Sequence, residues 1–165
     1  MTDRHTYVRI DNRLLHGQVA QFWIPYLQVE HLIIADDLAA SNPAMVSVYR
    51  MAIPRQIDLS VVMVTQLEAT VTGSTASCIL VVLSDVFDLA RARMSGFDCP
   101  ALTLGNIHSA RGRLRITDTV HLTPEETDAL IELHQEGKRI EIQTFPGTVL
   151  QLEWSGGKGA KWVKC

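Results

Sequence analysis

The chain has 165 residues, of which 47% are hydrophobic and 20% are charged. This length fits one ordinary domain, and the apolar content excludes a disordered polar chain. Fifteen lysines and arginines against eighteen aspartates and glutamates give a formal charge of -3, so attraction to a phosphate backbone cannot dominate and nucleic acid is not expected as a partner.

Neither a membrane-spanning segment nor a secretion signal is apparent in the sequence. The longest apolar run, Cys78–Leu83, is far shorter than the roughly 20 residues of a spanning helix, and the first ten residues lack an apolar core. The cysteines at positions 78, 99 and 165 form neither a C-x-x-C pair nor an even disulfide framework. We therefore expect a cytoplasmic protein without structural zinc.

Short apolar runs rich in Val, Ile and Leu predict β-strands along the chain. In chain order they are Tyr7–Ile10, His31–Ala35, Leu59–Val64, Cys78–Leu83, Ala101–Leu104, Ile116–Leu122 and Ile140–Gln143. Helices with recognisable capping residues are expected between most of them. The expected helix starts are Asn42 with Pro43, Thr65 with Glu68, Ser84 or Asp85, and Thr123 with Pro124 and Glu126.

Strand and helix alternate about five times, and runs such as CILVVL are apolar at successive positions, as in strands buried on both faces. The sequence therefore predicts an α/β fold: a three-layer sandwich with a mostly parallel open sheet of about 6–7 strands and helices on both faces. We assign residues 1–147 to this domain. Residues 148–165 are expected to form a C-terminal strand or a flexible tail.

The ends of the predicted strands hold the candidates for chemistry, because open parallel sheets bind ligands beyond the carboxyl ends of their strands. No G-x-G-x-x-G follows the first strand and no P-loop motif occurs, which argues against common nucleotide sites. Thr65 after the third strand and a first lysine only at Lys138 argue against a phosphoaspartate receiver. What remains is the loop Asp11–Val19, which delivers His16 to the start of a helix.

This loop has the residues that phosphoryl transfer needs. A neutral imidazole at His16 keeps a nucleophilic ring nitrogen at cytoplasmic pH. The backbone N–H groups of Gly17 and Gln18 are first-turn donors at the positive end of a helix dipole, where phosphate binds. Arg13 adds a guanidinium fork, and Asp11 is placed to accept from the other ring nitrogen. The residue types alone leave open a second interpretation, in which His16 merely caps a helix.

Other positions near the expected site have weaker assignments. Asp36 and Asp37 follow the second strand, where we favour helix capping over a pocket or docking role. Ser84 follows the fourth strand and is a candidate phosphate-binding residue. His108 and Arg111 belong to a basic loop that is either a docking rim for a phosphorylated partner or a solvated segment. No histidines have the spacing of metal ligands, so we expect no metal and no other cofactor.

The string VRIDNRLLHGQV at Val8–Val19 resembles the signature of the B component (enzyme IIB) of the mannose/fructose/sorbose class of bacterial sugar phosphotransferase systems. The resemblance continues through residues 32–37, 51–54, 104–105, 112, 121–126 and 137, to about Pro146.

The resemblance implies a cytoplasmic phosphotransferase, peripheral to the inner face of the membrane through its partners. His16 would take a phosphoryl group from the phosphorylated A component and pass it to a sugar held by membrane components C and D. Family precedent places the phosphate on Nδ1, with Arg13 as its main side-chain partner and Asp11 in the same loop. The residues themselves do not choose the nitrogen or the sugar.

The chain departs from the family pattern at two strand ends. Members commonly carry Asn and a Gly-Gly pair where this chain has Thr103–Asn106, and often Asn where it has Ser84. Hydroxyl groups in place of amides leave the efficiency of transfer open. The alternative function is a regulatory phosphoacceptor module linked to the phosphotransferase system, one that serves no sugar transporter.

Overall fold

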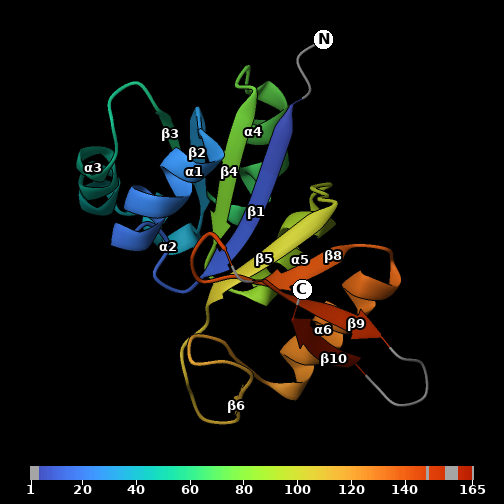
Figure 1. Cartoon of the computed structure of the whole chain (residues 1–165). Helices are drawn as coiled ribbons and strands as arrows, with labels where there is room; N and C mark the ends of the chain where they lie inside the picture. The colour runs from blue at the N-terminus through green and yellow to red at the C-terminus, as the bar shows by residue number, and fades with distance from the viewer. Residues whose placement is uncertain (1–3, 148, 155–159, 165) are drawn as a thin grey trace.

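The computed structural model describes residues 4–147, 149–154 and 160–164. Within these ranges, eight strands form one sheet that runs through the molecule, in the order β10-β9-β8-β5-β1-β4-β2-β3 (Figure 1). The strands are β1 (His5–Asp11), β2 (His31–Ala35), β3 (Asp58–Val62), β4 (Cys78–Leu83), β5 (Ala101–Asn106), β8 (Arg139–Ile142), β9 (Leu150–Trp154) and β10 (Ala160–Lys164). Every pairing from β3 across to β8 is parallel, and the two pairings that involve β9 are antiparallel.

Helices cover both faces of the sheet, which confirms the predicted three-layer α/β fold. One face carries η1 (Val19–Trp23), α1 (Ile24–Leu27), α2 (Asp37–Ala40) and α3 (Pro43–Ala52). The other face carries η2 (Val64–Gln66), α4 (Leu67–Gly73), α5 (Val86–Met94) and α6 (Pro124–Gln135). In the described part of the chain, no helix has the length and apolar character needed to cross a membrane.

Each helical layer encloses its own hydrophobic core, and the central strands contribute to both. In β2, Leu32 and Ile34 enter one core, whereas Ile33 and Ala35 enter the other. Successive side chains of a strand point to opposite faces, so a strand between two cores must be apolar throughout. This accounts for the complete burial of β2 and β4.

Three of the predicted helix starts are confirmed. The Asn42 side chain accepts from two N–H groups at the start of α3, and Asp85 accepts from the Asp88 N–H at the start of α5. Thr123 and Glu126 form a reciprocal capping box at the start of α6.

The predicted start at Thr65 is wrong, because Thr65 lies inside η2. That turn begins one residue earlier, at Val64. The Gln66 side chain accepts from the Met63 N–H at 3.1 Å, so a glutamine supplies the cap that we expected from the threonine.

The predicted strand at Ile116–Leu122 is also wrong. Its last two residues form the short strand β7 (His121–Leu122), which pairs with β6 (Leu114–Arg115) in a separate two-stranded sheet. The Thr117 hydroxyl accepts from the N–H groups of Thr119 and Val120 and closes a local turn. Such side-chain turns compete with strand pairing.

A register shift brings polar residues together at the carboxyl end of β1. Ile10 pairs with Leu104, but Asp11 pairs with Asn106, so Gly105 is the extra residue of a β-bulge in β5. A bulge bends its strand and redirects the side chains that follow. Asp11 and Asn106 therefore end their strands at the same level, where the chain leaves β1 toward η1.

Candidate active site

The loop from Asp11 to His16 is anchored by two buried leucines. The Leu14 N–H donates to the Asp11 carbonyl at 2.9 Å and closes a turn. Leu14 has a φ of 54°, in the left-handed region, which costs a leucine roughly 1–2 kcal/mol. Burial of the Leu14 and Leu15 side chains in the core beside η1 offsets this cost. The loop is therefore held in one shape, and it delivers His16 to the first turn of the following helix.

One ring nitrogen of His16 is held by a buried carboxylate. His16 Nε2 lies 2.8 Å from Asp11 Oδ2, and Asp11 is completely buried. Burial by itself would raise the pKa of Asp11, but the hydrogen bond from His16 and the positive charge of Arg9 outweigh it and hold that pKa below its ordinary value. An ionised carboxylate only accepts hydrogen bonds, so His16 carries its proton on Nε2.

The other ring nitrogen, Nδ1, faces the start of the helix. The His16 carbonyl accepts the first helical hydrogen bond, from Ala20, at 2.9 Å. The Gln18 N–H points at Nδ1 from 3.4 Å, a distance typical of a weak contact. Nothing lies within 4 Å of the position that a Cβ at Gly17 would take. His16 Nδ1 therefore has a lone pair and lies beside N–H groups of the first helical turn, next to the open space at Gly17.

The guanidinium group of Arg13 lies beside this space, and hydrogen bonds hold two of its three nitrogen atoms. Its backbone N–H donates to Asp11 Oδ1 at 3.1 Å, and its Nη2 donates to the Gln18 side chain at 3.0 Å. Neighbouring donors orient the Asn106 amide so that its oxygen accepts from Arg13 Nε at 3.1 Å. The Arg13 side chain is 38% exposed, and no hydrogen bond from Nη1 occurs among the described residues. The free edge of the guanidinium is available to an anion.

Comparison with known proteins identifies the family to which the chain belongs. The family model of the "PTS system sorbose subfamily IIB component" matches residues 5–151. The chain belongs to this family. It is a phosphoryl-transfer component of a sugar phosphotransferase system, as the loop sequence indicated.

Relatives of this IIB component match most of its length. A probable phosphotransferase enzyme IIB component of Streptococcus pyogenes is 28% identical over 138 residues, which cover 78% of this chain and 83% of the relative. The N-acetylgalactosamine-specific IIB component 1 of Escherichia coli is 26% identical, over 84% and 89% of the two chains. The crystal structure of an N-acetylgalactosamine IIB component of S. pyogenes superposes with a TM-score of 0.80 at 26% identity, covering 88% and 91%.

Asn12 fastens the active loop of the IIB component to its neighbours, a role that sequence reasoning missed. Its Nδ2 donates to the Ser84 carbonyl at 2.6 Å, and its Oδ1 accepts from the His108 N–H at 2.6 Å. The Ser84 hydroxyl donates to Asp88 at 2.7 Å. Ser84 thus contacts the loop through its backbone carbonyl. Its role in binding phosphate stays a prediction. The Asn106 amide oxygen, which accepts from Arg13 Nε, also lies 2.9 Å from His108 Nε2. Asn106 thus links His108 to Arg13.

Asp36 and Asp37 have structural partners. Asp36 caps α2 by accepting from the Ala39 N–H at 2.7 Å. Asp37 accepts from the Val64 N–H at 2.9 Å and from Arg91 at 2.5 Å. The hydrogen bond from Arg91 lowers the pKa of Asp37. Asp36 therefore has the capping role that we favoured, whereas the Asp37 side chain connects α2 to Val64 in η2 and Arg91 in α5.

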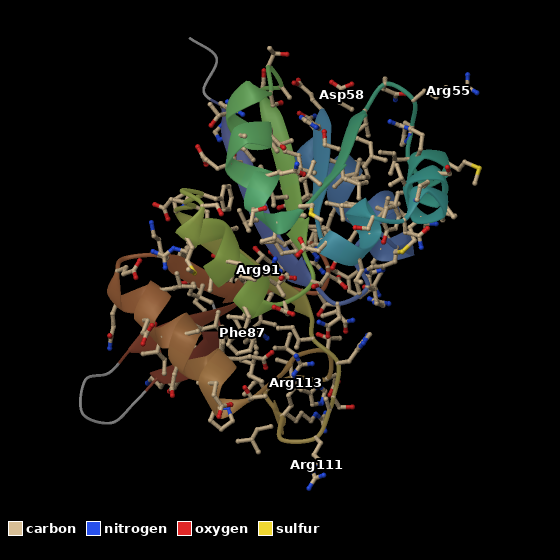
Figure 2. All side chains as sticks on the ribbon, turned by 180° about the vertical axis from the view of Figure 1, so that it is seen from behind. Arg55, Asp58, Phe87, Arg91, Arg111 and Arg113 are labelled. Atoms are coloured by element: carbon tan, nitrogen blue, oxygen red, sulfur yellow. The ribbon has the colours of Figure 1, made fainter. Side chains whose placement is uncertain are left out.

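The basic loop between β5 and β7 divides into an inner and an outer part. Arg113 pairs with the buried carboxylate of Glu126 at 2.7 Å. Arg111 extends from the tip of the loop away from the body of the molecule (Figure 2). Arg113 is therefore structural, whereas Arg111 is exposed at the loop tip and its docking role stays a prediction. Across the described ranges, no cluster of three or more His, Cys, Asp or Glu residues is arranged to hold a metal ion.

Arg9 is the second residue that sequence reasoning missed. It is 1% exposed and its Nη2 lies 3.4 Å from Asp11 Oδ2, the oxygen that holds His16. The available signal was an arginine between Val8 and Ile10 in an otherwise apolar stretch. Charged residues are almost never fully buried unless they are paired.

Proposed function

We propose that this IIB component is a cytoplasmic phosphohistidine carrier. In this function, His16 accepts a phosphoryl group from the phosphorylated A component and passes it to a sugar held by the membrane components C and D. The observation that carries the proposal is the state of the His16 ring: Nε2 is held by Asp11 while Nδ1 faces the first helical turn.

Loading begins with attack of the His16 Nδ1 lone pair on the phosphorus of the donor phosphohistidine. A new N–P bond forms, the donor N–P bond breaks, and its electron pair returns to the donor ring. Arg13 and the N–H groups of Gly17 and Gln18 stabilise the charge on the equatorial oxygens. The proton on Nε2 stays in its hydrogen bond with Asp11 throughout.

Unloading reverses the roles of the two atoms. A sugar hydroxyl attacks the phosphorus, its proton passes to water, and the N–P electron pair returns to Nδ1. Because Asp11 already fixes the ring and its proton, His16 needs no rearrangement between the two half-reactions. A site with one arginine and backbone donors binds the phosphoryl group moderately, as a carrier requires.

The sugar remains open, because relatives in the family differ in it. One relative is a sorbose-specific component of Klebsiella pneumoniae and another is N-acetylgalactosamine-specific. Names of this kind favour a sugar-specific component over a purely regulatory module. Asn106 and His108 border the loop through Arg13 and Asn12. Arg111, at the tip of the neighbouring basic loop, is the residue that we propose to contact a docking partner.

The test is intact-mass measurement after incubation with phosphoenolpyruvate and the upstream phosphocarriers. We expect the mass of one acid-labile phosphoryl group, mapped to His16, and delivery to a sugar in membranes that carry C and D components. His16→Gln should take no phosphate, whereas the matched variant His134→Gln, on α6, should take it normally. A stable modification on another residue would contradict the proposal. Phosphorylation without delivery to any sugar would favour the regulatory alternative.

A further inference from the structure

We infer that Arg9 is a positioning residue for phosphoryl transfer, which holds the Asp11 carboxylate so that His16 keeps its proton on Nε2 and presents Nδ1. This inference rests on the proposed role of His16. Among the described residues, Arg9 makes no hydrogen bond to the His16 ring, and its contact within the site is with Asp11. It acts through Asp11 alone.

The first support is the sharing of one oxygen atom. Asp11 Oδ2 accepts from His16 Nε2 at 2.8 Å and lies 3.4 Å from Arg9 Nη2. The other oxygen, Oδ1, accepts from the Arg13 N–H at 3.1 Å. Each oxygen of Asp11 therefore faces at least one hydrogen-bond donor. A rotation of the carboxylate that released His16 would also break the contacts with Arg9 and Arg13.

The second support is the way in which distant segments fix the Arg9 guanidinium. Nη1 donates to the Gln143 carbonyl at 2.8 Å, and Nη2 contacts the Thr144 carbonyl at 3.3 Å. The guanidinium carbon lies 4.7 Å from the centre of the Trp23 ring, a cation–π distance. Trp23 donates to the same Thr144 carbonyl at 3.0 Å. The segment after β8 and the helix after His16 thus both hold Arg9.

The third support is the space that β5 leaves for this side chain. A Cβ at Gly105 would lie 1.9 Å from Arg9 Nη2, closer than any real contact. Gly105 is also the bulge residue that levels Asn106 with Asp11. A single glycine therefore makes room for the guanidinium and sets the register of the site.

The cost of burying Arg9 indicates a function for it. Burial lowers the pKa of Arg9 to about 10, although the Asp11 charge opposes this shift, so Arg9 remains protonated near neutral pH. Its Nε has no hydrogen-bond partner within the described residues. Buried pairs of this kind are often replaceable by apolar residues without loss of stability. The charge of Arg9 lies where it contacts the carboxylate that orients His16.

The test compares Arg9→Met with wild type in transfer rate and in the state of His16. Loss of the positive charge should favour proton uptake by the coupled Asp11–His16 pair and so move the acid limb of the rate–pH profile to higher pH. We expect the rate near neutral pH to fall by about 10- to 100-fold, as for other displaced catalytic groups. The ¹⁵N chemical shifts of the His16 ring in the unphosphorylated protein should show a second tautomer.

Gly105→Ala is the independent variant, because it leaves Arg9 in the sequence but fills its space. It should move the same acid limb in the same direction. In the double variant with Arg9→Met, the two effects should be less than additive, since both act on one contact. Arg9→Lys keeps the charge and should lie between wild type and Arg9→Met.

Arg50→Met is the matched control. Arg50 also donates to backbone carbonyls, those of Ile57 at 2.8 Å and Pro54 at 2.6 Å, but it lies on α3. Its loss should lower stability without moving the acid limb or the His16 tautomer. If Arg9→Met fails to fold, Arg9→Lys and Gly105→Ala carry the same test.

An unchanged acid limb together with a single His16 tautomer in the folded Arg9 and Gly105 variants would overturn the inference. Failure of the proposed function looks different. In that case wild type itself takes no phosphate on His16, while the ¹⁵N spectra of the free protein still report whether Arg9 controls the ring.

Discussion

His16 follows the carboxyl end of β1 and His31 begins β2, so the two histidines lie at opposite ends of the parallel strands. Their comparison shows what makes a histidine reactive in this protein. Both ring nitrogens of His31 are held at 2.8 Å by hydroxyl groups, Nδ1 by Ser74 and Nε2 by Ser60. His16 has one nitrogen held by Asp11 at 2.8 Å, and the other meets only the Gln18 N–H at 3.4 Å. His31 is 8% exposed and the His16 side chain is 15% exposed, so both rings are largely shielded and they differ chiefly in their partners.

A histidine that accepts a phosphoryl group therefore needs one ring nitrogen that is held by a partner and one that is available. Two neutral hydroxyls saturate His31 and leave no lone pair for an incoming phosphorus. A carboxylate on one side of His16 fixes the proton and directs the lone pair of the other nitrogen outward.

The largest expected effect is the complete loss of phosphorylation in His16→Gln. His31→Gln should still be phosphorylated at close to the wild-type rate, because its ring takes no part in the site. Both variants can be followed by intact mass after incubation with the upstream phosphocarriers. Residual labelling of His16→Gln would show that another residue accepts the phosphate.

Asp11→Asn should lower the transfer rate by about 10²- to 10⁴-fold, the range for a lost base or a misoriented imidazole. Both Asp11 oxygens accept hydrogen bonds, from His16 and Arg13 respectively. An asparagine has one oxygen, so its NH₂ group must face one of these donors. Single-turnover kinetics measure the effect. A rate within threefold of wild type would remove Asp11 from the mechanism.

Arg13→Lys should fold normally and transfer about tenfold more slowly, since a lysine keeps the charge but loses the planar fork. Gln18 and Asn106 hold the present guanidinium by separate nitrogens, and an ammonium group cannot reproduce both contacts. Rapid-quench measurement of loading provides the rate. Transfer at the parental rate would leave Arg13 with a general electrostatic role.

The smallest effect concerns stability at His31. Burial, with help from the charge of Arg4 and against that of Asp58, lowers the pKa of His31. The unfolded chain therefore binds a proton that the folded chain resists, and stability falls as pH drops below the ordinary histidine value of about 6.5. Urea unfolding at about pH 7.5 and about pH 5.5 should show a smaller loss for His31→Gln than for wild type. An equal loss in both proteins would assign the pH dependence to other groups.

The sequence predicted the parts of the fold that depend on local pattern. Apolar runs located the central strands, and Asn42, Asp85 and Thr123 marked helix starts because caps act within a few residues. The turn at Thr117 was missed, since its hydroxyl competes with strand pairing in a segment that otherwise has β character.

The sequence also brought Asp11, Arg13 and His16 together, because one short loop holds all three. It could not place Arg9 or Asn106 around them. Their positions depend on the bulge at Gly105 and on contacts across more than a hundred residues, which no local pattern encodes.

The contacts of Arg9 also bear on when the site is completed during synthesis of the chain. The reactive loop emerges among the first twenty residues, but the carbonyl groups that hold Arg9 come 134 and 135 residues later. Contacts of such separation form late, after most loop-closure entropy has been spent. A ribosome-bound chain that has reached β5 already contains His16, Asp11 and Arg13, yet lacks the segment that fixes Arg9. A segment that is translated more than a hundred residues after the reactive loop therefore completes the setting of His16.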